Sequence, residues 1–376
     1  VSQGWIAFLG MEAYLFAFLL VLTLSLFFAE RYVLAGFSGG TLYLTRGEGM
    51  LVLSLVGLIQ IVRVLRQGGR FWRRSAVRSS MALGLGALLP LCLWSGYAWA
   101  TFGQILPNTL AAKQAQGRMA SGRPFLQRLW NVWLPTWGHL LSIGEKPFFS
   151  AWWLLVGSGI ILAWLKDRKW LAFLAWIALY ILGYTALQVS AYWWYQLPIH
   201  FVAQVFFALG IIGFIERVGS IDADLVVRGA LITAVLILVL GLPLRAKVQT
   251  TLDYEGDPRA ESYLGLAEWF RTHTDAEASI ASLEIGYLGY YTPNRIIDLA
   301  GLVMPEVVSH VVDQGYDWAF WHYQPDYYVY LQDFDWAVGD IVGDPRFDRD
   351  YEAVATLDGP RASDFSIYRR STNRDL

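Results

Sequence analysis

Several features that carry chemistry in soluble enzymes are scarce in this chain. Cys92 is its only cysteine, so no intrachain disulfide framework can form. No loop with the glycine spacing that cradles a phosphate precedes an expected helix of the last third, and no internal repeat is found. The histidines are scattered without the spacing of a zinc motif such as HExxH: His139, His200, His273, His310 and His322. These absences exclude a disulfide scaffold, a P-loop nucleotide enzyme, a repeat protein and a motif-bearing zinc hydrolase.

Charge is also scarce, and it is unevenly distributed. Of 376 residues, 16% are charged and 56% are hydrophobic, which is atypical of a soluble protein of this size. From Lys247 onward there are 23 acidic and 10 basic residues, whereas the part before it has 8 acidic and 19 basic residues. We therefore expect an α-helical polytopic membrane domain over residues 1–245, followed by a small extracytoplasmic α/β domain over residues 246–376.

Basic residues set the expected topology. Six arginines and no acidic residue lie between Arg63 and Arg78, and Lys166 to Lys169 is a second basic turn. By the positive-inside rule both segments are cytoplasmic, which puts the C-terminal domain outside a multi-pass cell-membrane protein. A nucleic-acid surface is the other interpretation of the arginines, but in so apolar a chain we expect no nucleic-acid partner. The expected crossings, besides a hairpin, are Trp5–Phe28, Ser80–Thr101, Ala151–Leu165, Trp170–Val189, Ile199–Ile215 and Gly229–Leu244.

The hairpin is centred on Thr45-Arg46-Gly47-Glu48-Gly49. The apolar runs on either side of it are each shorter than the roughly 20 residues that span a bilayer core. We expect two helices joined at the glycines, with Arg46 and Glu48 in or near apolar surroundings, where charges usually face water or a partner. One interpretation is an ion pair that closes a turn. The other is a cation held where an anionic lipid headgroup arrives. Glu12, in the first span, also requires an aqueous site.

Two segments on the expected outer side carry further candidates. Residues 102–149 form a long loop with Asn108 and Lys113, and its tryptophans suit an interfacial helix over 125–141. The turn 191–198 is dense in aromatic residues, among them Trp194 and Tyr195. These rings are typical of an interfacial belt, and they also suit a platform against sugar rings.

The last third alternates short helices and strands. We expect helices at Glu261–His273, Pro305–Val312 and Asp317–His322. The expected strands are Ser279–Leu283, Arg295–Leu299, Tyr327–Leu331, Ala353–Leu357 and Phe365–Arg369. The glycines between Glu284 and Tyr291 are interpreted as loop glycines. This alternation predicts a small α/β domain.

Five local patterns resemble the polyprenyl-phosphate-sugar-dependent glycosyltransferases of the GT-C superfamily. Gly10-Met11-Glu12-Ala13 resembles their Gly-Leu-Glu-Thr segment, and Thr45 to Gly49 resembles Thr-Arg-Pro-(Glu/Asp)-Gly, with Gly47 in place of proline. Leu106-Pro107-Asn108-Thr109, followed by Ala112-Lys113, is similar to the Pro-Asn-Thr and Ala-Lys loop of the actinobacterial arabinofuranosyltransferase or mannosyltransferase-like branch. Trp194-Tyr195 with Pro198, and Ile297 to Leu302, match later parts of the pattern.

The resemblance implies an enzyme that moves a sugar, with inversion, from a polyprenyl-phosphate donor to a glycan, lipid or protein acceptor. Arg46 and Lys113 would bind the donor phosphate. Glu12, Glu48, Asn108, Trp194 and Tyr195 would contact the substrate. The family's catalytic aspartate, in its first outer loop, is expected before Val1, so the chain resembles the C-terminal part of such an enzyme, or a pseudoenzyme.

Two other classes stay open from the residues alone. One is a transporter or flippase for a lipid-linked sugar, although only one interrupted helix is found where duplicated halves would predict two. The other is a non-catalytic membrane anchor that displays a glycan-binding domain. No cofactor is required by any spacing, while a divalent cation would find carboxylate ligands in Glu12 and Glu48.

Overall fold

The computed structural model describes residues 12–66, 70–106, 108–119, 124–133, 147–222, 224–237, 259–359 and 364–371. It divides into two compact units. The first contains Val1–Leu106, Leu126–Ala186 and Tyr192–Asp253. The second contains Pro107–Phe125, Leu187–Ala191 and Tyr254–Leu376, so two segments from within the first two thirds of the chain belong with the C-terminal residues.

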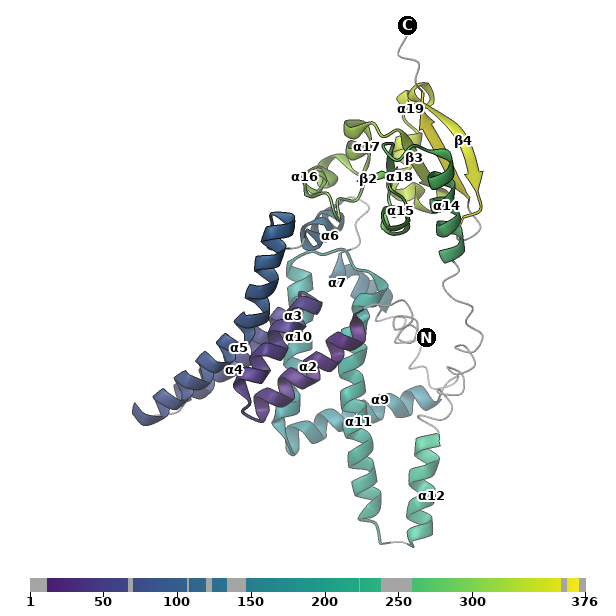
Figure 1. The fold of residues 1–376 in the computed structure, drawn as a ribbon. Coiled ribbons are helices and arrows are strands. Elements are labelled where there is room, and N and C mark those ends of the chain that lie inside the picture. Colours follow the sequence, from purple (N-terminus) through teal and green to yellow (C-terminus); the bar gives the residue numbers. More distant parts are fainter. Residues whose placement is uncertain are drawn as a thin grey trace. The chain divides into compact units, whose positions relative to one another are not determined.

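The first unit is helical (Figure 1). Among its described residues, four helical segments are long and apolar enough to cross a membrane, namely Gly49–Arg66, Ala76–Phe102, Arg168–Ala186 and Trp194–Gly219. The chain is therefore a candidate multi-pass membrane protein, as its composition predicts. The elements of this unit are α2 (Ala13–Phe28), α3 (Tyr32–Thr45), α4 (Gly49–Arg66), α5 (Arg70–Phe102), α7 (Phe125–Arg128), η1 (Leu129–Trp133), α9 (Pro147–Leu165), η2 (Arg168–Trp170), α10 (Leu171–Ala186), η3 (Trp193–Gln196), α11 (Leu197–Gly219) and α12 (Leu225–Leu236).

Several helix boundaries differ from the expected ones. The two helices around Arg46 are confirmed, but the second of them, α4, continues to Arg66 and is by itself long and apolar enough to cross a membrane, contrary to the expected short run. The arginine-rich segment is helical where the structure describes it, since α4 ends at Arg66 and α5 begins at Arg70. Residues 70–80 contain no proline or glycine, so the sequence does not interrupt the helix there. The expected interfacial helix over 125–141 is seen as α7 and η1, and its remainder, with Trp137, lies outside the described residues, as do residues 5–11 of the first expected span.

Glycines bring the helix backbones of this unit into contact. A Cβ atom added at Gly36 of α3 would lie 2.0 Å from the Leu83 carbonyl oxygen of α5, and one added at Gly86 of α5 would lie 2.2 Å from the Val33 carbonyl oxygen. The same holds between α9 and α11, where a Cβ at Gly210 would lie 1.9 Å from the Leu155 carbonyl oxygen. Small residues at such crossings are typical of helices that pack within a membrane.

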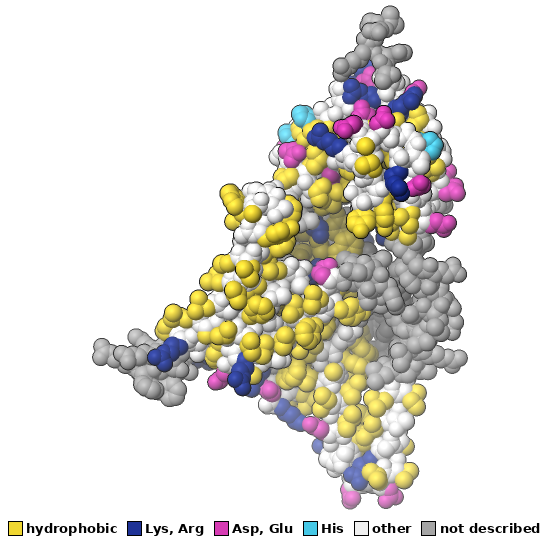
Figure 2. Space-filling model, viewed as in Figure 1, with side chains coloured by type: hydrophobic (Ala, Val, Ile, Leu, Met, Phe, Trp, Pro, Cys, Tyr) yellow, Lys and Arg dark blue, Asp and Glu magenta, His cyan; other side chains and the backbone are white. Residues whose placement is uncertain are grey.

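The outward face of the first unit is apolar. Its core contains buried side chains such as Phe27, Val56 and Trp176, yet many large apolar side chains are exposed, including Leu93 and Leu154. Figure 2 shows hydrophobic side chains spread over one face of this unit, whereas the face of the second unit carries charged groups of both signs. In water so much exposed apolar surface would be unfavourable, so this face is suited to lipid.

The second unit is built around one mixed sheet of five strands in the order β2-β1-β3-β5-β4. The strands are β1 (Ser279–Ser282), β2 (Arg295–Asp298), β3 (Tyr327–Leu331), β4 (Tyr351–Leu357) and β5 (Phe365–Arg370). β1 pairs in parallel with β2 and β3, whereas β5 pairs antiparallel with β3 and β4. All five expected strands are confirmed, with ends that differ by at most a few residues.

Helices cover this sheet and bury its apolar side chains. They are α6 (Thr109–Arg118), α14 (Ala260–His273), α15 (Gly286–Tyr291), α16 (Pro305–Gln314), α17 (Asp317–Tyr323), α18 (Asp335–Val342) and α19 (Pro345–Asp350), together with the short turn η5 (Gln332–Phe334). The expectation of a loop at the glycines of 284–291 is wrong. α15 forms there because Leu288 is fully buried and neither glycine of the helix needs a positive φ.

The early helix α6 is part of this second unit. It packs against α16, and its Ala115 joins the buried core of the domain. The Ser190 N–H donates to the Lys113 carbonyl oxygen at 3.0 Å, and the Phe125 N–H donates to the Val189 carbonyl oxygen at 3.1 Å. Residues 107–125 and 187–191 are thus joined by backbone hydrogen bonds.

Candidate functional site

The turn between α3 and α4 is shaped by its glycines. α3 ends because Arg46 has an extended backbone, and the Gly49 N–H closes the turn on the Arg46 carbonyl oxygen at 2.9 Å. A Cβ atom at Gly49 would lie 2.5 Å from the Tyr43 nitrogen, so glycine is required there. An added side chain at Gly47 would meet open space, which fits a position where the resembled family has proline. Arg46 and Glu48 are thereby held on a tight turn.

Two carboxylates hold the Arg46 guanidinium. Its Nη2 donates to Glu48 Oε1 at 2.8 Å, and its Nε lies 3.2 and 3.3 Å from the two oxygens of the same carboxylate. Its Nη1 donates to Glu12 Oε1 at 3.0 Å, across 34 residues of sequence. The Arg46 side chain is 9% exposed and that of Glu48 is 5% exposed, whereas Glu12 is 38% exposed. Arg46 therefore has one buried partner and one accessible partner.

Aromatic rings complete the surroundings of this group. Tyr184 of α10 donates its hydroxyl to Glu48 Oε1 at 2.6 Å, and Tyr180, one turn earlier, donates to the Tyr195 carbonyl oxygen at 2.8 Å. The rings of Phe16 and Tyr195 each lie with their centroids 6.0 Å from Arg46 Cζ, a distance at which a cation is attracted to a ring face. We name Glu12, Arg46, Glu48, Tyr184 and Tyr195 the arginine cluster.

The charges in the arginine cluster do not cancel, because it contains one guanidinium and two carboxylates. A guanidinium has five N–H groups, and the hydrogen bonds to Glu12 and Glu48 use three of them. Two N–H groups of Arg46 are left without a partner among the residues that the structure describes. The cluster can therefore offer hydrogen-bond donors from Arg46 and acceptors from the accessible Glu12 to one polar ligand.

The aromatic turn lies beside the cluster. Trp194 stacks on Tyr192 with centroids 4.7 Å apart and planes at 7°, and its ring meets Tyr195 edge-on at 6.2 Å. Tyr195 is buried, whereas Trp194 is half-buried. Of the two candidates from this turn, Tyr195 touches the arginine cluster through its ring, and Trp194 extends the aromatic surface next to it.

The remaining sequence candidates, Asn108 and Lys113, belong to the second unit. The Asn108 amide donates to the Gly301 carbonyl oxygen at 2.6 Å, which ties the start of α6 to the turn after β2. Lys113 is half-buried on α6, where its carbonyl oxygen accepts the bond from Ser190. The convergence of these two side chains with Arg46 on one site stays a prediction.

The turn that Asn108 contacts is organised by a buried aspartate. Asp298 is fully buried, and its two carboxylate oxygens accept hydrogen bonds from the N–H groups of Ala300 at 3.0 Å and Val303 at 2.8 Å. Burial raises the pKa of Asp298 above its ordinary value, although these N–H donors act in the opposite direction. Gly301 in this turn has a φ of 70°, which favours glycine. Asp298 thus builds the loop and is closed to solvent.

Sequence reasoning missed Tyr180 and Tyr184. The signal was there, because two tyrosines four residues apart lie on one face of an otherwise apolar helix, and polar groups in such a helix usually point to a partner. What it could not provide was the identity of that partner.

No group of three or more His, Cys, Asp or Glu side chains that could hold a metal ion is found in the described part of the chain. At the place suggested for a divalent cation, between Glu12 and Glu48, the structure has the Arg46 guanidinium. Both carboxylates are engaged with that guanidinium, which supplies the positive charge there.

Comparison with known proteins reaches only the C-terminal part. Residues 251–370 match the model of a family described as a domain of unknown function, DUF8728. No curated protein and no solved structure matches the chain. The matched region coincides with the sheet and most of its covering helices.

Proposed function

We propose that the protein is a membrane glycosyltransferase of the GT-C type, which takes a sugar from a polyprenyl-phosphate donor on the extracytoplasmic side of the cell membrane. The observation that carries this proposal is the arginine cluster, a buried guanidinium held by two carboxylates at the end of two apolar helices. The resemblance of the Thr45 to Gly49 turn to a family motif supports the same reading, as do the aromatic rings beside it.

The chemistry of such a transfer suits these groups. The bond between the anomeric carbon and the lipid phosphate breaks as an acceptor hydroxyl attacks, a base takes the proton of that hydroxyl, and the phosphate oxygen gains negative charge. A cation already fixed in place stabilises that growing charge without reorganising. Arg46 has this property because it is held by the buried Glu48 carboxylate, which is itself fixed by the Tyr184 hydroxyl.

The two carboxylates have different roles in this proposal. Glu48 is a positioning residue, since its oxygens are occupied by Arg46 and Tyr184. Glu12 is the partner that exchanges, because its side chain is the exposed one and its departure would free a further Arg46 N–H for a phosphate oxygen. The apolar face of the first unit would accommodate the polyprenyl tail.

The test is sugar transfer by the full-length protein in proteoliposomes, with polyprenyl-phosphate pentose and hexose donors and membrane glycolipid extracts as acceptors. We expect Arg46→Ala to lower kcat by roughly 10²–10³, the usual effect of losing one preorganised contact to a developing charge. Arg46→Lys should recover only part, because a point charge replaces a planar fork that can bind two oxygens. Donor binding, measured with a photoreactive analogue, should change less than kcat.

Arg31→Ala is the matched control, since Arg31 is an exposed arginine at the opposite end of α3. All rates are normalised to folded protein. Near-normal turnover per folded Arg46→Ala molecule, combined with poor folding, would return Arg46 to a purely structural role. Failure of the wild-type protein to transfer sugar from any of the donors would overturn the proposed function.

A further inference from the structure

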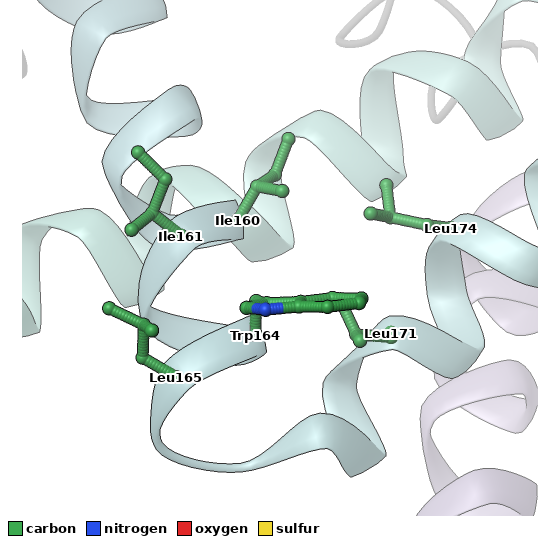
Figure 3. Close-up of a pocket in the computed structure, with 6 residues that line it drawn as sticks. All are labelled: Ile160, Ile161, Trp164, Leu165, Leu171 and Leu174. Carbon is green, nitrogen blue, oxygen red and sulfur yellow. The ribbon is translucent and has the colours of Figure 1, made fainter.

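An apolar cavity bordered by basic residues lies away from the arginine cluster, between the end of α9 and the start of α10. A cavity of about 420 Å³ opens there. It is lined only by apolar side chains, of which Ile160, Ile161, Trp164 and Leu165 come from α9 and Leu171 and Leu174 from α10. Figure 3 shows the Trp164 ring in the middle of these side chains, with the aliphatic groups around it. The volume falls within the range of small-molecule pockets.

The mouth of the cavity is open to the surroundings of the protein. Trp164 is 57% exposed and Leu165 is 72% exposed. The cavity is bounded by the start of α10, and the segment Arg168–Ala186 is long and apolar enough to cross a membrane. A cavity at the first turn of a membrane-crossing helix would lie where the acyl chains of one leaflet meet their headgroups.

Basic groups border the cavity at this level. Arg168 Cζ lies 5.0 Å from the Trp164 ring centroid, and Arg168 Nε lies 3.4 Å from the Trp164 carbonyl oxygen, so the guanidinium is held over one wall of the cavity. Lys169 follows it and is exposed. Lys166 is paired with Glu216 of α11, and Asp167 caps the turn by accepting the Lys169 N–H at 3.2 Å. Residues 166–169 together carry three basic groups and one acid.

We propose that this cavity is a binding site for an anionic glycerophospholipid of the leaflet that borders the Lys166 to Lys169 turn. One acyl chain occupies the apolar cavity beside Trp164, and the phosphate binds Arg168 and Lys169. Charge complementarity distinguishes this occupant from a bulk lipid, because basic groups above an apolar recess between helices favour anionic headgroups. Tryptophan rings at this depth suit the same boundary layer. The site is independent of the arginine cluster and of the proposed transfer reaction.

The test is native mass spectrometry of the full chain, purified in detergent and titrated with phosphatidylglycerol or phosphatidylcholine of identical acyl chains. We expect phosphatidylglycerol to bind more tightly, by about 5-fold for each basic group that contacts its phosphate. Arg168→Gln should lower the preference for phosphatidylglycerol by about 5-fold and leave the affinity for phosphatidylcholine unchanged. Ile161→Trp, which fills the cavity from its exposed wall, should weaken the binding of both lipids.

Arg217→Gln is the matched control, because Arg217 is an exposed base on the last turn of α11 that does not line the cavity. It should leave both affinities unchanged. Glycerol 3-phosphate, the headgroup chemistry without chains, should not compete at concentrations where the lipid saturates. Equal affinity for the two lipids, equal effects of Arg168→Gln and Arg217→Gln, or full competition by glycerol 3-phosphate would each overturn the proposal. If Ile161→Trp fails to fold, the comparison of the two arginine variants still decides it.

Discussion

Glu12 and Glu48 both pair with Arg46, but they differ in how deeply they are buried. A buried charge that loses its partner is costly, because the remaining charge is neither solvated nor paired. Glu48 is almost fully buried and also accepts the Tyr184 hydroxyl, while Glu12 is substantially exposed. Both carboxylates contact the same guanidinium, but water can replace only one of them.

This difference predicts unequal effects on stability. Glu48→Ala should lower the free energy of unfolding by about 3–5 kcal/mol, as expected for one partner of a buried pair. Glu12→Ala should lower it by about 1 kcal/mol or less, since its side chain is accessible to water. Denaturant unfolding in one detergent, followed by tryptophan fluorescence, measures both variants.

Glu216→Ala is the control for these variants, because Glu216 pairs with Lys166 in an exposed ion pair and its loss should have little effect. Equal losses for Glu12→Ala and Glu48→Ala would show that burial does not separate the two carboxylates.

At the scale of helices, close backbone approach is decided by where glycine lies on the helix surface. α5 contains Gly84 and Gly86, two residues apart and therefore on different faces. Gly86 is buried against α3, whereas a Cβ atom at Gly84 would meet nothing within 4 Å. The same amino acid is thus a packing requirement at one position and is unconstrained at the other.

The pair provides a matched test of helix packing. Gly86→Ala should destabilise the protein by about 1–3 kcal/mol, because the added methyl group overlaps the α3 backbone and the two helices must separate. Gly84→Ala should be neutral or slightly stabilising, since alanine has the higher helix propensity. Melting temperatures of the two variants in the same detergent give the comparison. A Gly86→Ala protein as stable as Gly84→Ala would contradict the α3–α5 contact.

At the scale of the whole molecule, charge and apolar surface are separated between the two units. The long apolar helices suggest a multi-pass membrane protein, and the acidic C-terminal part forms a sheet domain with a buried core of its own. The six arginines on the last turn of α4 and in the first part of α5 are accompanied by no acidic residue between Arg63 and Arg78. They are the basis for predicting its orientation.

We predict that the arginine-rich segment is cytoplasmic and that the C-terminal domain is outside. In a Cys92→Ala background, Ser309→Cys on α16 should react with a membrane-impermeant maleimide in intact cells. Leu65→Cys, between two of the arginines, should react only after permeabilisation. Labelling of Leu65→Cys in intact cells, with Ser309→Cys protected, would show the opposite orientation.

The sequence by itself determined the local elements of this protein. Short runs bounded by glycine, proline, aspartate and asparagine predicted all five strands. Apolar runs predicted three of the long apolar helical segments, Ala76–Phe102, Arg168–Ala186 and Trp194–Gly219, whereas Gly49–Arg66 is longer than the apolar run expected there. The turn with Arg46 and Glu48 was also predictable, since glycines between two apolar runs are a local signal. These features follow from interactions over a few residues, which a sequence displays directly.

Only the tertiary structure decided which distant groups meet. Tyr184 reaches Glu48 across 136 residues, and Asn108 reaches Gly301 across 193 residues, neither of which any local pattern indicates. The assignment of α6 to the sheet domain also depends on such contacts. Contacts of this kind arise when helices and strands pack, because packing satisfies buried polar groups with whichever partner the fold brings near. At Arg46, the fold brings Glu12 and Tyr184 to the turn that carries Arg46 and Glu48, and together they form an ionic cluster.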